Sequence, residues 1–148
     1  MDGQPRSWSA HGMTGFDGAA LMRQLIGSSP FAVHLGLEVV ELADGRALLS
    51  MSFREELVTL GRTVHGGALA ALLDTTAMAA AWCGAPEPER LQGSTISLAI
   101  SYLAPADAAD VLAEARVLRR GRSIAHVEVA ATAAGSPVAS ALVSYKLG

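Results

Sequence analysis

The sequence is poor in residue types that often reveal a protein's chemistry. It contains one cysteine, Cys83, and one lysine, Lys146, among its 148 residues. A single cysteine excludes a disulfide framework within the chain and a zinc site built from several cysteines. It also fits a reducing compartment, so we expect a cytoplasmic protein without a metal site.

Charged residues are scarce as well, at 17% of the chain, with a net charge of −3. This balance gives no indication of a nucleic-acid partner. No N-terminal stretch has the layout of a signal peptide, and no apolar run reaches the roughly 18 residues of a membrane span, so we expect no membrane partner. With 51% hydrophobic residues, the low charge favours a protein that buries further surface in an oligomer.

The most informative stretch runs from Val64 to Trp82 and reads VHGGALAALLDTTAMAAAW. From Ala68 onward it consists mostly of strong helix formers without proline or glycine, which predicts a helix of about four turns. The helix is apolar on nearly every side, as is typical of a buried helix. Because it is too short to span a bilayer, we interpret it as a central helix covered by a sheet.

Two features of this stretch indicate a site. Gly66 and Gly67 precede the helix, where free N–H groups and the positive end of the helix dipole suit an oxyanion or a polarised carbonyl oxygen. Asp74 lies about two turns later on roughly the same face, and a carboxylate in apolar surroundings is costly unless it is paired or used. An activated carbonyl held by the glycines and water activated by the acid would make a hydrolase.

A structural interpretation of the same residues stays open. The His-Gly-Gly segment is then only a turn that leads into a helix, and His65 is a hydrogen-bonding residue near its start. Asp74 is a carboxylate paired with a neighbouring hydroxyl or with a donor at an interface. Buried structural carboxylates also form such pairs.

Helix and strand signals surround this stretch. Asp17 is placed to cap a short helix that runs through Ile26. We expect residues 1–16 to form a flexible tail, residues 31–34 to lead into the first strand, and residues 17–148 to form a single domain.

Several segments alternate with the period of two that is typical of strands. An Asp44-Gly45 turn predicts a hairpin between the first two, and the others follow the central helix, at 95–103, 111–118, 123–133 and 137–147. In the segment 95–103, the alternation places Ile96 on the apolar face and Thr95 on the opposite one. This order predicts an α+β protein in which a curved antiparallel sheet wraps one long helix.

These features together resemble the hotdog-fold acyl-CoA thioesterases of the PaaI type. The resemblance rests on the order of elements, the HGG before an apolar helix that carries an acid, the strand ending ISYLAP, and a basic glycine turn between two late strands. It covers roughly residues 31–147. It implies hydrolysis of acyl-CoA to a free carboxylic acid and coenzyme A, with no metal or redox cofactor.

The resemblance also implies roles for single residues. The backbone N–H of Gly66 would bind the thioester carbonyl, with Gly67 beside it, and Asp74 would act as general base or nucleophile. His65 would help to orient the loop or the thioester. Thr95 matches a serine or threonine that orients water in many members, although an ordinary strand threonine is the alternative.

One position departs from the pattern of the family. Many relatives carry an asparagine six residues before the histidine, and this chain has Thr59 there. A threonine hydroxyl donates one hydrogen bond but does not reach as far as an amide. The departure implies an altered substrate preference or a lower activity.

Three arginines in the basic turn are candidates for binding the phosphates of coenzyme A: Arg119, Arg120 and Arg122. Arginine suits phosphate geometry, and the equivalent turn in the family lies near the nucleotide. The alternative is a solvated hairpin tip.

Two other functions remain compatible with the same residues. A non-catalytic acyl-CoA sensor would keep the pocket and the arginines, and a hotdog dehydratase or hydratase would act on the acyl chain instead. The resemblance places the site between two subunits, so a dimer is the minimum. Many relatives pair dimers into a homotetramer, a dimer of dimers.

Overall fold

A single curved sheet and one central helix organise the structure. The computed structural model describes residues 15–148 of the chain. Its helical segments are α1 (Gly18–Ser28), α2 (Pro30–Leu35), α3 (Gly66–Trp82) and a short 3-10 turn, η1 (Glu55–Leu57). Its strands are β1 (Leu37–Ala43), β2 (Arg46–Met51), β3 (Val58–Leu60), β4 (Thr63–Val64), β5 (Gly93–Tyr102), β6 (Val111–Arg120), β7 (Ile124–Ala133) and β8 (Ser136–Leu147).

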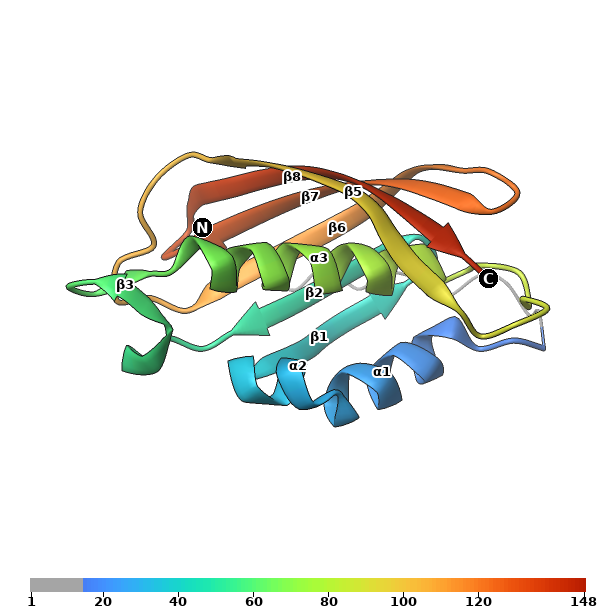
Figure 1. Ribbon diagram of the computed structural model, residues 1–148, viewed down its shortest axis with the longest axis horizontal. Coiled ribbons are helices and arrows are strands. Elements are labelled where there is room, and N and C mark those ends of the chain that lie inside the picture. The colour runs from blue at the N-terminus through green and yellow to red at the C-terminus, as the bar shows by residue number, and fades with distance from the viewer. Residues whose placement is uncertain (1–14) are drawn as a thin grey trace, which may run out of the picture.

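The main sheet has six strands in the order β1-β2-β6-β7-β8-β5, and β3 and β4 form a separate small ribbon. All neighbouring strands of the main sheet are antiparallel. Helix α3 crosses the inner face of this sheet, while α1 and α2 lie beside it near β1 (Figure 1). This is the hotdog arrangement, so the predicted fold class is confirmed.

Helix α3 fills the centre because it is apolar on nearly every side. Leu72, Ala77 and Ala80 have no exposed surface, and many of the sheet residues that face them are also alanine or valine. These small side chains let the helix lie close against the curved sheet, as expected for a close-packed interior. The helix begins two residues before the predicted start at Ala68, because both glycines adopt helical geometry.

The predicted first helix is confirmed, with its cap. The Asp17 carboxylate accepts a hydrogen bond from the Ala20 N–H at 2.9 Å. The expectation that residues 31–34 lead directly into a strand is wrong, because α2 occupies Pro30–Leu35. Proline at the first helical position needs no N–H, so Pro30 starts this short helix readily. The expected tail lies outside the described residues, except for its last two positions.

The predicted hairpin is present, and its turn needs glycine. Gly45 adopts φ of +63° between β1 and β2, a conformation that L-residues with a side chain rarely adopt. Strands β5 to β8 match the four later predicted segments within a few residues.

The predicted side-chain alternation of β5 is wrong at its first positions. Pairing with β8 runs Thr95 opposite Tyr145 and then Ser97 opposite Ser144, so Ile96 is an extra residue without a partner. This bulge shifts the alternation by one residue. Thr95 therefore shares the inner face with Leu98, whereas Ile96 is exposed over 54% of its surface.

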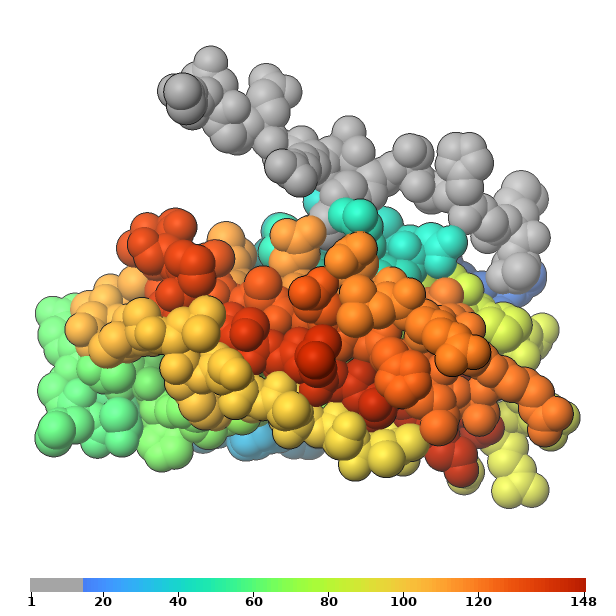
Figure 2. All heavy atoms as spheres, turned by 90° about the horizontal axis from the view of Figure 1, so that it is seen from above, coloured from blue at the N-terminus to red at the C-terminus, as the bar shows by residue number. Residues whose placement is uncertain are grey.

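Strand β5 is an edge of the main sheet. Seen from the outer face, it runs along one margin of the sheet, beside β8 (Figure 2). An edge strand presents unpaired N–H and C=O groups that another chain can pair with. None of the helices described in residues 15–148 is long and apolar enough to cross a bilayer.

Candidate active site

The His-Gly-Gly segment forms the start of α3, and His65 caps it. The Nδ1 atom of His65 accepts a hydrogen bond from the Gly67 N–H at 2.7 Å. Gly66 is the first residue of the helix, so its N–H belongs to the turn whose donors lack an acceptor within the helix. The His65 side chain thus provides an acceptor for the Gly67 N–H. The Gly66 N–H stays at the positive end of the helix dipole.

A tyrosine that the sequence did not single out fixes Gly66. The Tyr102 hydroxyl, at the end of β5, donates a hydrogen bond to the Gly66 carbonyl oxygen at 2.9 Å. A Cβ added to Gly66 would lie 3.4 Å from the Tyr102 ring. The tyrosine therefore orients the first peptide of α3 from the side. Its only sequence signal was its place at the end of a strand.

Asp74 and Thr95 are in direct contact. The Thr95 hydroxyl donates a hydrogen bond to the Asp74 carboxylate at 2.6 Å, and both residues are half-buried. The bulge at Ile96 makes this contact possible, because without it Thr95 would point to the outer face of the sheet. A short hydrogen bond to an ionised acceptor is among the stronger ones, so it holds one carboxylate oxygen in place.

Two buried aromatic residues extend this group toward the end of α3. Tyr145 lies opposite Thr95 in the sheet, and its hydroxyl accepts a hydrogen bond from Trp82 Nε1 at 3.2 Å. Burial raises the pKa of Tyr145, with a further rise from the charge of Asp74, while the Trp82 hydrogen bond opposes both. The hydrogen bond between Trp82 and Tyr145 thus connects the end of α3 to the strand that pairs with Thr95.

The proposed catalytic residues fall into two groups on one chain. Thr59 lies with Gly66 around a hollow of about 380 Å³ at the start of α3, while Asp74 lies at mid-helix. Asp74 follows Gly66 by eight positions, which corresponds to about 12 Å along a helix. The Gly66 amide and the Asp74 carboxylate of one chain are therefore too far apart to contact one small group at the same time.

The three arginines of the basic turn lie at the opposite end of α3 and differ in their surroundings. The Arg120 guanidinium donates hydrogen bonds to the carbonyl oxygens of Ala81 at 3.1 Å and Cys83 at 2.8 Å. It also lies 3.7 Å from the Asp44 carboxylate. Arg120 thus caps the last turn of α3, whereas Arg119 and Arg122 are exposed.

The described residues contain no group of three or more side chains that could together bind a metal ion. His126, on β7, instead contacts the Ser144 hydroxyl across the sheet at 3.1 Å. This contact belongs to the outer face of the sheet and not to the residues around α3.

An antiparallel sheet wrapped around one apolar helix is the fold that this chain shares with a protein of the thioesterase superfamily, which is 28% identical with a TM-score of 0.77, covering 88% of this chain and 98% of that one. A model of the acyl-CoA thioesterase N-terminal domain matches residues 53–146. The chain belongs to this acyl-CoA thioesterase family, whose members are thioester hydrolases. The predicted acyl-CoA thioesterase family is confirmed.

Curated relatives cover most of the chain. A Halobacterium salinarum protein with the provisional name of esterase is 35% identical over 123 residues, which span 79% of this chain and 81% of the relative. Human acyl-coenzyme A thioesterase 13 is 30% identical over 118 residues, which span 76% of this chain and 80% of the relative.

Solved structures share the fold. A mutant of the phenylacetic acid degradation protein PaaI from Thermus thermophilus is 29% identical, with a TM-score of 0.72, covering 81% of this chain and 100% of that one. The PaaI protein of Escherichia coli has a TM-score of 0.79 at 19% identity, covering 88% of this chain and 94% of that one. At that identity, the second likeness is one of fold alone.

Proposed function

We propose that the chain hydrolyses acyl-CoA thioesters to a free carboxylic acid and coenzyme A. The observation that carries the proposal is the hydrogen bond from Thr95 to Asp74 at 2.6 Å. It orients a half-buried carboxylate on an otherwise apolar helix, as a general base or nucleophile requires. Family membership supplies the class of bond that this carboxylate attacks.

In the proposed reaction, the thioester carbonyl oxygen accepts a hydrogen bond from the Gly66 N–H at the positive end of α3. Negative charge that develops on this oxygen is stabilised by that amide and by the helix dipole. Asp74 removes a proton from water, which attacks the carbonyl carbon, or Asp74 attacks directly and water then cleaves the mixed anhydride. In either route the C–S bond breaks, and the thiolate of coenzyme A leaves and takes up a proton.

The site needs a second copy of the chain, because one helix separates the two groups by about 12 Å. We propose that Gly66 of one subunit and Asp74 of the other act on the same carbonyl. The exposed edge strand β5 carries Thr95 at one end and Tyr102 at the other. Antiparallel pairing of two β5 strands would therefore bring the two groups together, and such dimers would associate into a tetramer.

The remaining site residues have supporting roles in this proposal. His65 fixes the start of α3 through its bond to Gly67, and Thr59 offers a hydroxyl beside the thioester. Arg119 and Arg122 are free to bind the phosphates of coenzyme A, whereas the guanidinium of Arg120 is engaged with the end of α3.

The test measures release of free thiol from a panel of acyl-CoAs, with Asp74→Asn in parallel. We expect turnover that falls at least about 10²-fold in the variant, the usual loss when a catalytic base is removed. Circular dichroism and sedimentation velocity check that the variant stays folded and oligomeric. Binding of acyl-CoA by the wild-type protein without turnover of any member of the panel would contradict the proposal and favour a sensor.

A further inference from the structure

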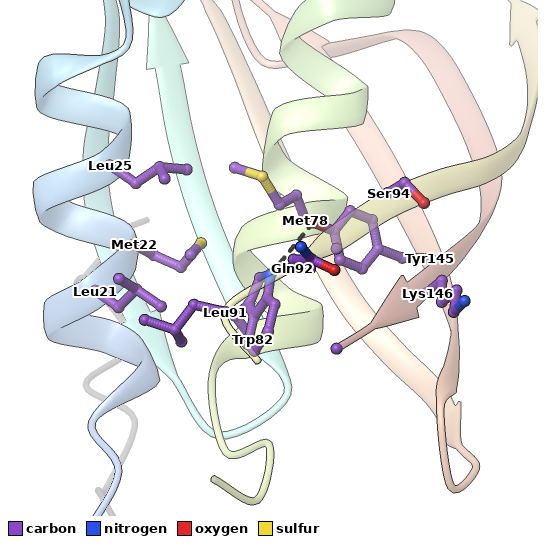
Figure 3. A pocket seen from close by; sticks show the side chains of 12 residues that line it. Leu21, Met22, Leu25, Met78, Trp82, Leu91, Gln92, Ser94, Tyr145 and Lys146 are labelled. Carbon is purple, nitrogen blue, oxygen red and sulfur yellow. Dashed lines mark hydrogen bonds between the residues drawn. The ribbon is translucent and has the colours of Figure 1, made fainter. Parts of the chain in front are cut away.

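A cavity of about 560 Å³ lies between α1, the second half of α3 and the ends of β5 and β8. Figure 3 shows the side chains of α1 facing those of α3 across it. Its walls are mostly apolar and aromatic, with the principal side chains Leu21, Leu25, Met78, Trp82, Leu91 and Tyr145. Its lining shares no residue with the hollow beside Thr59 and Gly66.

The cavity adjoins the proposed catalytic carboxylate. Met78 lies four residues after Asp74 on α3, so the two side chains occupy the same face of the helix. Tyr145, on the wall of the cavity, is the cross-strand neighbour of Thr95, which donates a hydrogen bond to Asp74. The inner end of the cavity, at Met78, therefore lies about one helical turn from the carboxylate.

The rim of the cavity is also apolar. Leu25 is exposed over 41% of its surface and Leu91 over 64%. Large apolar side chains left in water around a concave site are typical of a surface that a ligand covers. The α1 helix thus supplies a wall that both encloses the cavity and lines its entrance.

One charged side chain lines the cavity, Lys146 at the end of β8. The other lining side chains are apolar, aromatic or uncharged and polar. An aliphatic acyl group would therefore meet mostly apolar walls.

We propose that this cavity binds the acyl group of the substrate, and that the enzyme prefers aliphatic acyl chains of medium length. The proposal rests on the proposed thioester hydrolysis and names its substrate class. A volume of about 560 Å³ falls in the range of pockets that hold a drug-sized ligand, which is more space than a single aromatic ring fills. The Leu and Met walls are flexible and suit a chain of methylenes.

The first experiment measures kcat/KM for straight-chain acyl-CoAs from acetyl to palmitoyl, beside phenylacetyl-CoA. Each methylene that enters the cavity should raise kcat/KM about three- to fourfold, until the cavity is full. A flat chain-length profile, or a preference for phenylacetyl-CoA over every aliphatic member, would overturn the inference.

A variant tests whether α1 forms the wall. Leu25→Trp places a larger side chain at the rim and should lower kcat/KM about tenfold or more for the best chain while leaving acetyl-CoA nearly unchanged. Val33→Trp is the matched control, because Val33 is exposed on α2 and does not line the cavity. Equal losses of kcat/KM in the two variants, or an unchanged chain-length profile in Leu25→Trp, would contradict the assignment of α1 as a wall of the acyl-binding cavity.

A binding measurement separates this inference from the catalytic proposal. The chain has two tryptophans, Trp8 and Trp82, and Trp82 lines the cavity. In Trp8→Phe, titration with decanoic acid should change the fluorescence of Trp82 in a saturable manner, and titration with acetate should not. Saturable binding without turnover of any thioester would contradict the catalytic proposal alone. Asp74-dependent turnover without this fluorescence change would contradict only the assignment of the cavity.

Discussion

At the scale of the residue, a single hydroxyl determines the position of the proposed base. The hydrogen bond from Thr95 fixes one oxygen of Asp74, and the bulge at Ile96 turns Thr95 inward. Sequence alternation alone assigns Thr95 to the outer face, because a bulge leaves no clear mark in a run of alternating residues. The role of Tyr102 was equally hidden, since its partner lies 36 positions away in the sequence.

Replacing Thr95 tests this positioning role. Thr95→Val removes the hydroxyl at nearly constant volume and should lower kcat roughly 10- to 100-fold, which corresponds to one hydrogen bond to a charged group. Thr95→Ser keeps the donor and should restore most of the rate. Steady-state kinetics on the preferred acyl-CoA measure both, and a rise in KM with kcat unchanged in Thr95→Val would speak against the role.

The two glycines at the helix start should respond differently to alanine. A Cβ on Gly67 would lie 2.9 Å from His65 Nδ1, so Gly67→Ala should displace the cap and cost about 1 kcal/mol of stability. A Cβ on Gly66 reaches only ordinary contact with Tyr102, so Gly66→Ala should be neutral or stabilise by up to about 1 kcal/mol, because alanine favours the helix. Urea denaturation of both variants measures the difference, and the opposite order would refute the cap geometry.

At the scale of the element, α3 is held at both ends by side chains from outside the helix. His65 caps its start, and Arg120, from the end of β6, donates to the carbonyl oxygens of its last turn. A cation at this position also interacts favourably with the negative end of the helix dipole. The basic turn therefore stabilises the end of α3, in addition to its proposed binding of phosphate.

Alanine substitutions should separate these two uses of arginine. Arg120→Ala should lower the free energy of unfolding by about 1 to 3 kcal/mol, because it leaves carbonyl oxygens at the helix end without their donor. Arg119→Ala should leave stability nearly unchanged and raise KM for acyl-CoA severalfold. Thermal melts measure the stability of each variant, and steady-state kinetics measure its KM for acyl-CoA. Equal stability losses in the two variants would contradict the different roles.

The elements themselves were largely predictable from periodicity. The long helix, the Asp44-Gly45 hairpin and the four late strands follow from apolar spacing and turn residues alone. Helix α2 was missed because its six residues are too few to show a helical period. The bulge in β5 was missed because either register places apolar residues on one face.

At the scale of the whole molecule, a buried thiol links stability to pH. Burial raises the pKa of Cys83 from 9.0 to about 12, although the Arg120 charge opposes the rise. Above pH 9 the unfolded chain loses the thiol proton while the folded chain keeps it, so the unfolded state binds fewer protons and stability falls with pH.

This link gives a measurable slope. Between pH 9 and 12, Cys83 should lower the free energy of unfolding by up to about 1.4 kcal/mol per pH unit. Burial of Tyr145 acts in the same direction. In Cys83→Ala the decline should become shallower, whatever the variant loses at neutral pH. Denaturation curves from pH 8 to 11 provide the measurement, and identical slopes in the two proteins would contradict the link.

The order of the elements along the chain also determines when α3 becomes covered during synthesis on the ribosome. Helix α3 ends at Trp82, but β8, which pairs with β5 and covers that helix, ends at Leu147. At a synthesis rate of about 5 to 20 residues per second, the apolar helix waits for roughly 3 to 13 s before its covering strands emerge. During translation this helix is the segment most in need of a chaperone, and a nascent chain that stalls before β8 should be a ready substrate for one.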